Sequence, residues 1–248
     1  MIMNTPNTLT LAKFLRQSRR YLLNAGAVVA TIVVATNTHA GRPMVVEDAE
    51  LLDEKSCQVE TFVQRNRGES TEYWVVPSCN PTGNLEISIG GMRERASGER
   101  ETHGVIQAKT VFREVEPGDW GVGLVVGNEW SRSSRFWNDY YATVPFTFAL
   151  RDERTLVHAN IGWRHERDGR RDFLTAGLGL EYELSERNAL SAETFVEDSG
   201  RPFYQVGYRH WLVQDRVQFD LSYGSRFGGG RERFATVGFV FVSPPFLP

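Results

Sequence analysis

One pattern repeats from Cys57 to Val242: short stretches in which apolar and polar residues alternate, with a turn signal every ten to sixteen residues. The stretch from Leu174 to Leu184 shows it most clearly, because leucine, alanine and tyrosine occupy every second position and threonine, glycine and glutamate the others. Successive side chains of a β-strand point to opposite faces of a sheet, so this alternation predicts strands with one apolar and one polar face.

About twelve strands are expected, each with roughly the nine to eleven residues that a tilted strand needs to cross a bilayer. Their predicted ranges are 57–66, 70–79, 84–94, 103–113, 119–128, 139–150, 155–165, 172–184, 189–197, 202–213, 216–225 and 232–242.

The connections alternate between tight turns, such as 80–83 and 185–188, and mostly longer loops rich in arginine and glycine, such as 129–136 and 166–171. Outer-membrane barrels have short periplasmic turns and longer outer loops, whereas a soluble β-sandwich, the alternative, does not need this order. Lipid offers no partner for an unpaired backbone group, so a wall of strands must close. We therefore predict an all-β fold, a single antiparallel up-and-down transmembrane β-barrel of about twelve strands, over residues 57–248.

The first forty residues carry the features of a signal peptide. A basic region that ends at Arg20 precedes the apolar run 21–35, and Thr38-His39-Ala40 fits a small-x-small cleavage site. Residues 1–40 are thus predicted to be a cleaved signal peptide, and the polar, acidic residues 41–56 a periplasmic lead-in to the barrel. The protein is expected in the outer membrane of a Gram-negative cell.

The charge balance argues against nucleic acid as a partner. The 248 residues include 28 basic and 31 acidic ones. Residues 1–40 contain four basic residues and no acidic residue, so the remaining chain carries a net charge of −7. A nucleic-acid-binding domain shows a basic patch or stripe instead.

Cys57 and Cys79 are the only two cysteines. A first hairpin centred on Gly68 places them directly opposite each other at its base, where some cross-strand pairs are close enough for a disulfide. The periplasm is oxidising, so we predict a disulfide that joins the two ends of this hairpin. The alternative is two free thiols. A metal site is not predicted, because two cysteines without nearby histidines form a poor ligand set.

Charged residues fall on the face of the strands that is predicted to line the lumen. The tight turn at 214–215 makes Arg209 face Asp220, and a three-residue turn at 186–188 makes Glu181 face Glu193, with Arg209 diagonal to Glu193. Opposed like charges are destabilising unless they are compensated. The predicted charged layer either lines a permeation path or fills the barrel, and it comprises Lys109, Glu181, Glu183, Glu193, Arg209 and Asp220, with Glu197 on the same face.

The outer loops hold many arginines, and the arginine fork binds phosphate in a bidentate manner. We expect contacts with lipopolysaccharide phosphates from Arg132, Arg135, Arg170 and Arg171. The alternative is a solvated loop whose arginines pair with nearby Glu and Asp.

No catalytic constellation stands out. Twelve-stranded lipid hydrolases need a serine and a histidine within hydrogen-bond reach. Here His158 is followed two residues later by Asn160, and both are predicted to face the lumen rather than lipid. We predict a structural histidine, no enzyme activity, no cofactor and no metal.

Several motifs resemble a group of uncharacterised proteobacterial outer-membrane barrel proteins. They are Gly41-Arg-Pro, Glu47-Asp-Ala49, Cys57-Gln-Val-Glu60, Cys79-Asn-Pro81, Asn84-Leu-Glu86, Gln107-Ala-Lys-Thr110, Arg201-Pro-Phe-Tyr-Gln205 and the ending Ser243-Pro-Pro-Phe-Leu-Pro248. More distantly, the chain is similar to barrel proteins linked to the meta-pathway of phenol degradation, which are described as transporters. The resemblance implies fold and location, and it supplies no catalytic residues.

Three functions remain open. The first is a transporter or narrow channel for small molecules, hydrophobic ones included. The second is a non-conducting structural or surface-interaction barrel with a plugged lumen, and the third is a lipid-modifying enzyme. The expected partners are outer-membrane lipid, lipopolysaccharide and the barrel assembly machinery, whereas the oligomeric state is left open.

Overall fold

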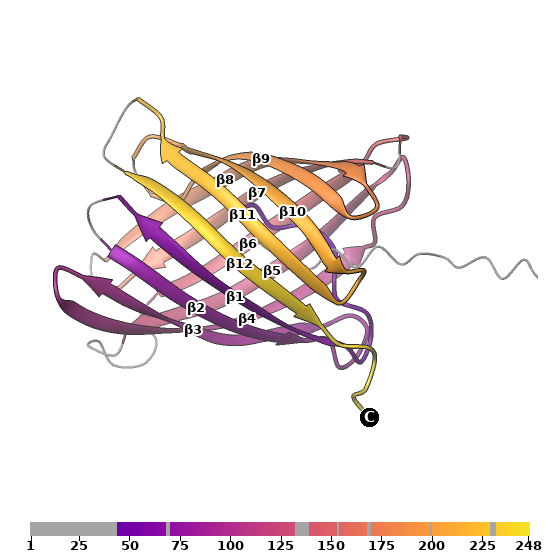
Figure 1. Cartoon of the computed structure of the whole chain (residues 1–248), viewed down its shortest axis with the longest axis horizontal. Coiled ribbons are helices and arrows are strands. Elements are labelled where there is room, and N and C mark those ends of the chain that lie inside the picture. The colour runs from indigo at the N-terminus through magenta and orange to yellow at the C-terminus, as the bar shows by residue number, and fades with distance from the viewer. Residues whose placement is uncertain are drawn as a thin grey trace, which may run out of the picture. The chain divides into compact units, whose positions relative to one another are not determined.

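The computed structural model describes residues 44–67, 70–131, 139–152, 154–167, 170–198, 200–228 and 232–248. These residues form twelve antiparallel strands that close into one barrel, because β1 pairs with β12 (Figure 1). The strands are β1 (Cys57–Asn66), β2 (Ser70–Cys79), β3 (Glu86–Ala96), β4 (Glu99–Arg113), β5 (Trp120–Ser131), β6 (Asp139–Ala149), β7 (Thr155–Glu166), β8 (Arg171–Ser185), β9 (Asn188–Val196), β10 (Phe203–Val213), β11 (Val217–Arg226) and β12 (Arg233–Val242). Among the described residues, no helix is long and apolar enough to span a membrane.

The predicted fold class is confirmed: every strand pairs with its neighbours in the sequence, and each predicted strand overlaps an observed one. The largest difference lies at the start of β4, which begins at Glu99 rather than at residue 103. The C terminus lies at the end of the barrel opposite the β1–β2 connection (Figure 1). We call the end that holds the C terminus and the tight turns the turn end, and the end that holds the β1–β2 connection the loop end. The predicted signal peptide lies outside the described residues.

The two faces of the wall have opposite chemistry. Large apolar side chains point outward and are exposed, with Leu174 at 79%, Ile161 at 60% and Ile89 at 58% of their surface. The inward face instead buries polar side chains such as Gln218 and Thr147. A soluble domain has the reverse arrangement, whereas a barrel in lipid needs an outward apolar band and tolerates a polar interior.

The register of two hairpins agrees with the prediction. Cys57 pairs with Cys79 across β1 and β2, and the two sulfurs form a disulfide. Arg209 on β10 pairs with Asp220 on β11. The β1–β2 ladder is regular up to its turn, so counting residues from the turn identifies the cross-strand partner. In the β10–β11 hairpin a register shift between Trp211 and Val213 lies beside the turn, and the partners beyond it still agree with the prediction.

The predicted register between β8 and β9 is wrong. Glu181 lies opposite Ser191, and Glu193 lies opposite Gly179. The cause is the connection: Ser185 pairs with Asn188, and the register shifts between Glu183 and Ser185. A bulge next to a turn displaces every later partner. Glu181 and Glu193 therefore do not face each other, and the structure removes the predicted clash of like charges.

The disulfide is expected to stabilise the closed barrel. It joins residues 22 positions apart, and a loop of this length corresponds to about 3 kcal/mol of lost unfolded-state entropy. The double variant Cys57→Ala/Cys79→Ala should lower the free energy of unfolding by up to that amount, measured by urea titration in lipid vesicles. The wild type in reducing agent should show the same loss, and equal stability of all three samples would contradict the role.

Candidate functional site

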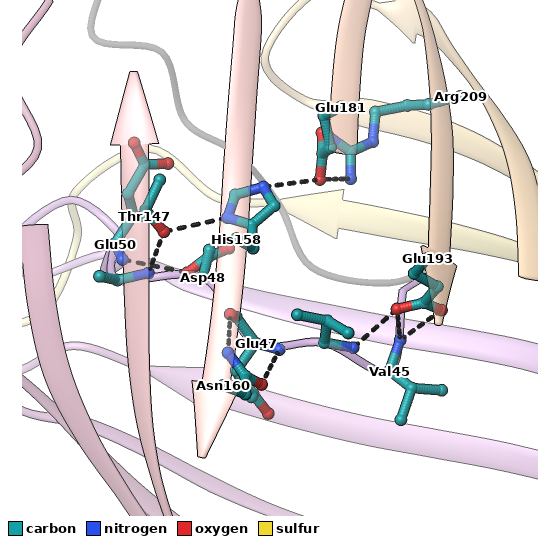
Figure 2. A network of polar contacts seen from close by, with 12 residues as sticks. Val45, Glu47, Asp48, Glu50, Thr147, His158, Asn160, Glu181, Glu193 and Arg209 are labelled. Atoms are coloured by element: carbon teal, nitrogen blue, oxygen red, sulfur yellow. Dashed lines mark hydrogen bonds and ion pairs between the residues drawn. The ribbon is translucent and has the colours of Figure 1, made fainter. Parts of the chain in front are cut away.

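A segment before the first strand lies inside the barrel. The backbone N–H groups of Val45 and Val46 both donate to the Glu193 carboxylate on β9, at 2.8 to 3.0 Å (Figure 2). The buried Met44 and Val46 side chains pack against Phe195 of the same strand. We call residues 44–52 the lumen segment, because side chains of the inner wall bind it along its length.

Three further strands hold the lumen segment. Asn160 on β7 binds Glu47 twice, since its Oδ1 accepts from the Glu47 N–H and its Nδ2 donates to the Glu47 carbonyl, both at 2.7 Å (Figure 2). Closer to the turn end, Thr147 Oγ1 on β6 accepts from the Ala49 N–H at 2.8 Å. Glu86 on β3 completes the set, since its Oε2 accepts from the Leu52 N–H at 3.1 Å.

Part of the range 41–56, which was predicted as a periplasmic lead-in to the barrel, lies inside the lumen. The described part of that range, from Met44 onward, lies in the lumen as far as Leu52 and reaches the turn end before Cys57. Residues 41–56 show no regular alternation, so the prediction of a lead-in rested on their polarity alone. The same polarity suits a polar lumen, where backbone and carboxylate groups find partners on the wall.

Two glycines on the inner face of β8 make room for the lumen segment. A Cβ atom on Gly179 would lie 2.3 Å from Met44 Cε, and one on Gly177 would lie 2.7 Å from Val46 Cγ2. Contacts this short do not occur, so a larger residue at either position would force the Met44 or Val46 side chain to shift. The glycines in the alternating 174–184 stretch are a sequence feature from which a chain inside the lumen could have been predicted.

Lys109 forms the first buried charge centre and ties the wall to the lumen segment. Its Nζ lies 2.5 Å from Asp48 Oδ1 and 3.6 Å from Glu47 Oε2. Burial by itself would raise the pKa of the Asp48 carboxyl, but the Lys109 ammonium, the nearby His158 and the Glu50 N–H together outweigh it and lower the pKa below its usual value. Asp48 thus stays ionised, and the pair links β4 to the segment.

Arg209 forms the second charge centre, within the wall. Its Nη1 lies 2.9 Å from Glu181 Oε2 on β8, and its Nε lies 3.9 Å from Asp220 Oδ1 on β11. Gln218 Nε2 also donates to both Asp220 oxygens, at 2.9 and 2.8 Å. Arg209, Glu181 and Asp220 therefore come together as predicted. Glu193 does not join them, since it binds the lumen segment instead.

His158 on β7 lies between the lumen segment and the Arg209 centre. It is only 1% exposed, its Nδ1 lies 3.0 Å from Thr147 Oγ1, and its Nε2 lies 3.8 Å from Glu181 Oε1 (Figure 2). Thr147 in turn accepts from the lumen segment. The imidazole thus faces the lumen as predicted and lies within a polar network.

The remaining predicted residues lie apart. Glu183 is half-buried near the turn end, where its N–H donates to the Arg154 carbonyl at 2.8 Å. Arg170 is exposed in the β7–β8 connection, and Arg171 lies 3.6 Å from Glu166 Oε2. Arg132 and Arg135 fall outside the described residues.

One group of side chains near the loop end has the composition of a metal-ligand set. His103 Nε2 lies 3.9 Å from Glu94 Oε2 and 3.7 Å from Glu101 Oε2. All three are part-exposed, and a protonated His103 would compensate the two acids without an ion. The sequence analysis did not single out this group.

The lumen segment leaves separate spaces within the barrel. A cavity of about 120 Å³ lies between the segment and the inner faces of β1 to β5. Another of about 120 Å³ lies toward β7 to β9. A larger space of about 480 Å³ opens near the loop end, where Arg67, Arg226 and Glu232 line it.

The family pattern described as "Uncharacterised conserved protein UCP029691" matches residues 28–242, most of the chain. The chain belongs to this family. No curated protein shows significant sequence similarity to it. This match supports the part of the sequence-based resemblance that pointed to a family of uncharacterised proteins.

Three solved structures are similar in fold. The KdgM porin has a TM-score of 0.59 at 11% identity, over 74% of this chain and 98% of that one. The NanC porin has a TM-score of 0.57 at 9% identity, over 75% and 98%. The COG4313 outer membrane channel from Pseudomonas putida F1 has a TM-score of 0.52 at 11% identity, over 82% and 100%. At these identities the comparison shows that the chain has the fold of an outer-membrane β-barrel.

Removing the Glu193 carboxylate should release the start of the lumen segment. A hydrogen bond to a charged group contributes roughly 1.5–3 kcal/mol, which corresponds to at least about a tenfold change in an equilibrium constant. In Glu193→Ala, hydrogen exchange at the Val45 and Val46 amides should therefore accelerate by about tenfold or more. The control Glu197→Ala removes a carboxylate near the loop end and should leave these amides protected. Unchanged protection in Glu193→Ala would contradict the assignment.

Removing Arg209 alone should cost more than removing its whole network. Arg209→Met leaves Glu181 and Asp220 buried without their counter-charge, and breaking a buried pair in this way costs about 3–5 kcal/mol. The triple variant Arg209→Met/Glu181→Gln/Asp220→Asn should lose less free energy of unfolding, measured by urea titration in vesicles. Equal losses in the single and triple variants would show that the carboxylates do not depend on Arg209.

Proposed function

We propose that the protein is an outer-membrane channel for small molecules whose lumen segment closes the pore. The observation that carries this proposal is the way the segment is held. Its N–H groups bind side chains of the wall, and the strand ladder is complete without it. The segment can therefore leave the lumen without breaking any backbone pair of the barrel.

The comparisons support the proposal at the level of fold. Two of the similar structures are porins and a third is an outer membrane channel. One KdgM structure is described as a complex with disordered oligogalacturonate. A polyanion of that kind does not suit the cavity between the lumen segment and strands β1 to β5. The described residues that line this cavity include seven with carboxylates and only two with basic groups. The sequence resemblance to proteins linked to the meta-pathway of phenol degradation, which the comparisons do not show, is the reason to propose small molecules with an apolar part instead.

A non-conducting barrel is the second candidate, and the buried ion pairs favour it. Lys109 with Asp48 and Arg209 with Glu181 fill the lumen with charges that are already compensated. In that case the lumen segment would be a permanent part of the core. A lipid-modifying activity has less support, because His158 contacts Thr147 and Glu181 inside the lumen.

The location of the barrel in the outer membrane, its orientation and its lipid contacts are also part of the proposal. A cleaved signal peptide over residues 1–40, periplasmic turns and outer loops follow from the proposed location in the outer membrane. Arg170 and Arg171 then face the outer leaflet, and we propose that they contact lipopolysaccharide phosphates. Exposure of both side chains near the loop end supports this.

Deleting residues 41–52 should open the pore. The lumen would lose its backbone plug, so single-channel conductance in planar bilayers should rise from rare openings to a steady open level. Circular dichroism and heat-modifiable migration on gels would check that the variant still forms a barrel. A folded deletion variant without conductance would overturn the channel proposal and favour the structural barrel.

A reversible tether offers a matched control. The Cβ of Val46 lies 3.6 Å from the position that a Cβ on Gly177 would occupy, within the range for disulfides. The oxidised Val46→Cys/Gly177→Cys variant should lose the rare openings of the wild type, and reduction should restore them. The wild type in the same reducing agent separates this effect from that of Cys57–Cys79.

A further inference from the structure

The cavity between the lumen segment and the first strands has an ordered inner wall. On β1, Gln58, Glu60 and Phe62 point inward at alternate positions. Across the hairpin, Phe62 pairs with Trp74 and Gln58 pairs with Ser78. The lumen segment closes the other side, so both the wall and the segment contribute to this cavity.

The charge of the cavity selects for a cation. Among the described lining residues, seven carry carboxylates and two are basic. Both basic groups are engaged in ion pairs, Lys109 with Asp48 and Arg209 with Glu181. The lining therefore has an excess of negative charge, and charges away from bulk water interact more strongly than charges at a surface.

A buried amide supplies a second, independent observation. Gln58 is 5% exposed, and its Nε2 donates to Glu60 Oε1 at 2.9 Å. No donor among the described residues reaches the buried Gln58 Oε1. A buried acceptor without a partner costs about 1–3 kcal/mol, so a ligand that brings an N–H or O–H donor is favoured here.

The aromatic pair gives the cavity an apolar, electron-rich side. The rings of Phe62 and Trp74 stack, with centroids 5.5 Å apart and planes inclined by 14°. Trp74 Nε1 donates to Glu72 Oε2 at 2.9 Å, which fixes the indole. Aromatic faces attract cations and also pack against alkyl groups.

We propose that this cavity binds a small organic ammonium ion with an apolar body, with its charge near Glu60 and an N–H donated to Gln58 Oε1. The inference rests on the proposed function, because solutes must reach the lumen. The size fits: the cavity measures about 120 Å³, and a cavity of about 150 Å³ holds a benzene molecule. An inorganic cation would satisfy the carboxylates but not the aromatic pair.

The test uses three probes of nearly equal shape: n-butylammonium, n-butanol and butanoate. Each is titrated into the full mature protein in detergent micelles by isothermal calorimetry. Butylammonium should bind at least about tenfold more tightly than butanol, the effect of roughly one charged hydrogen bond, and butanoate should not bind. Comparable binding of butanol or butanoate would overturn the proposal, as would absence of butylammonium binding.

Matched variants locate the site. Glu60→Gln keeps the shape and removes the charge, and Gln58→Leu removes the acceptor, so each should weaken butylammonium binding by about tenfold. Trp74→Leu should also weaken it, whereas Glu183→Gln neutralises a lumen carboxylate outside this cavity and should leave it unchanged. Binding that Ca²⁺ displaces and that Trp74→Leu leaves intact would assign the site to inorganic cations and overturn the proposal.

The two proposals fail in different ways. If the deletion variant conducts and wild-type protein does not bind butylammonium, the channel stands and the cation site falls. If butylammonium binds as expected but the deletion variant never conducts, the barrel has a ligand site and no channel activity.

Discussion

Closure of the barrel is the constraint on which the rest of the structure depends. Because β1 pairs with β12, the strand ladder has no free edge. A chain inside the lumen therefore cannot join the sheet, and its buried N–H groups still need acceptors. The wall supplies them as side chains, with Glu193 and Asn160 midway along their strands and Thr147 closer to the turn end. A segment held in this way is specific in register but remains separable from the wall.

The two charge centres differ in whether they include the lumen segment. Arg209 joins β10 to Glu181 on β8 and to Asp220 on β11, so this centre is complete without the lumen segment. Lys109 on β4 instead depends on Asp48 and Glu47 of the segment for its closest carboxylates. Departure of the segment would leave Lys109 without them, while Glu86 stays within the same cavity lining. The cost of opening is therefore concentrated at Lys109 rather than at Arg209.

The fold could be predicted because alternation with a period of two residues identifies where the strands lie and which side chains share a face. The stretch from Leu174 to Leu184 shows this most clearly. Counting from a tight turn also gave the Cys57–Cys79 and Arg209–Asp220 pairs. The β8–β9 pairing failed because the turn between Ser185 and Asn188 is one residue shorter than predicted and a register shift follows it, neither of which has a sequence period.

The site was predictable only in part. Residues 44–52 have no regular alternation, and what holds them is a set of contacts to strands that are distant in the sequence, such as Val45 to Glu193, 148 residues away. Pattern analysis does not detect such contacts. The inward glycines of β8 were a local sign, since an inward face that lacks side chains leaves space for another chain.

The lumen segment and the cation cavity are thermodynamically coupled, because the segment forms one side of the cavity. A cation that contacts Glu47 or Asp48 binds the closed state more tightly and stabilises it, whereas one near Glu60 and the Phe62–Trp74 pair acts on the segment only through its charge. The excess of carboxylates also acts on the segment itself, since Glu47, Asp48 and Glu50 lie in the same cavity lining as the wall acids. A bound cation lowers that repulsion. The direction that follows is closure: an ammonium ion in this cavity holds the segment in place, and the pore opens more readily when the cavity is empty.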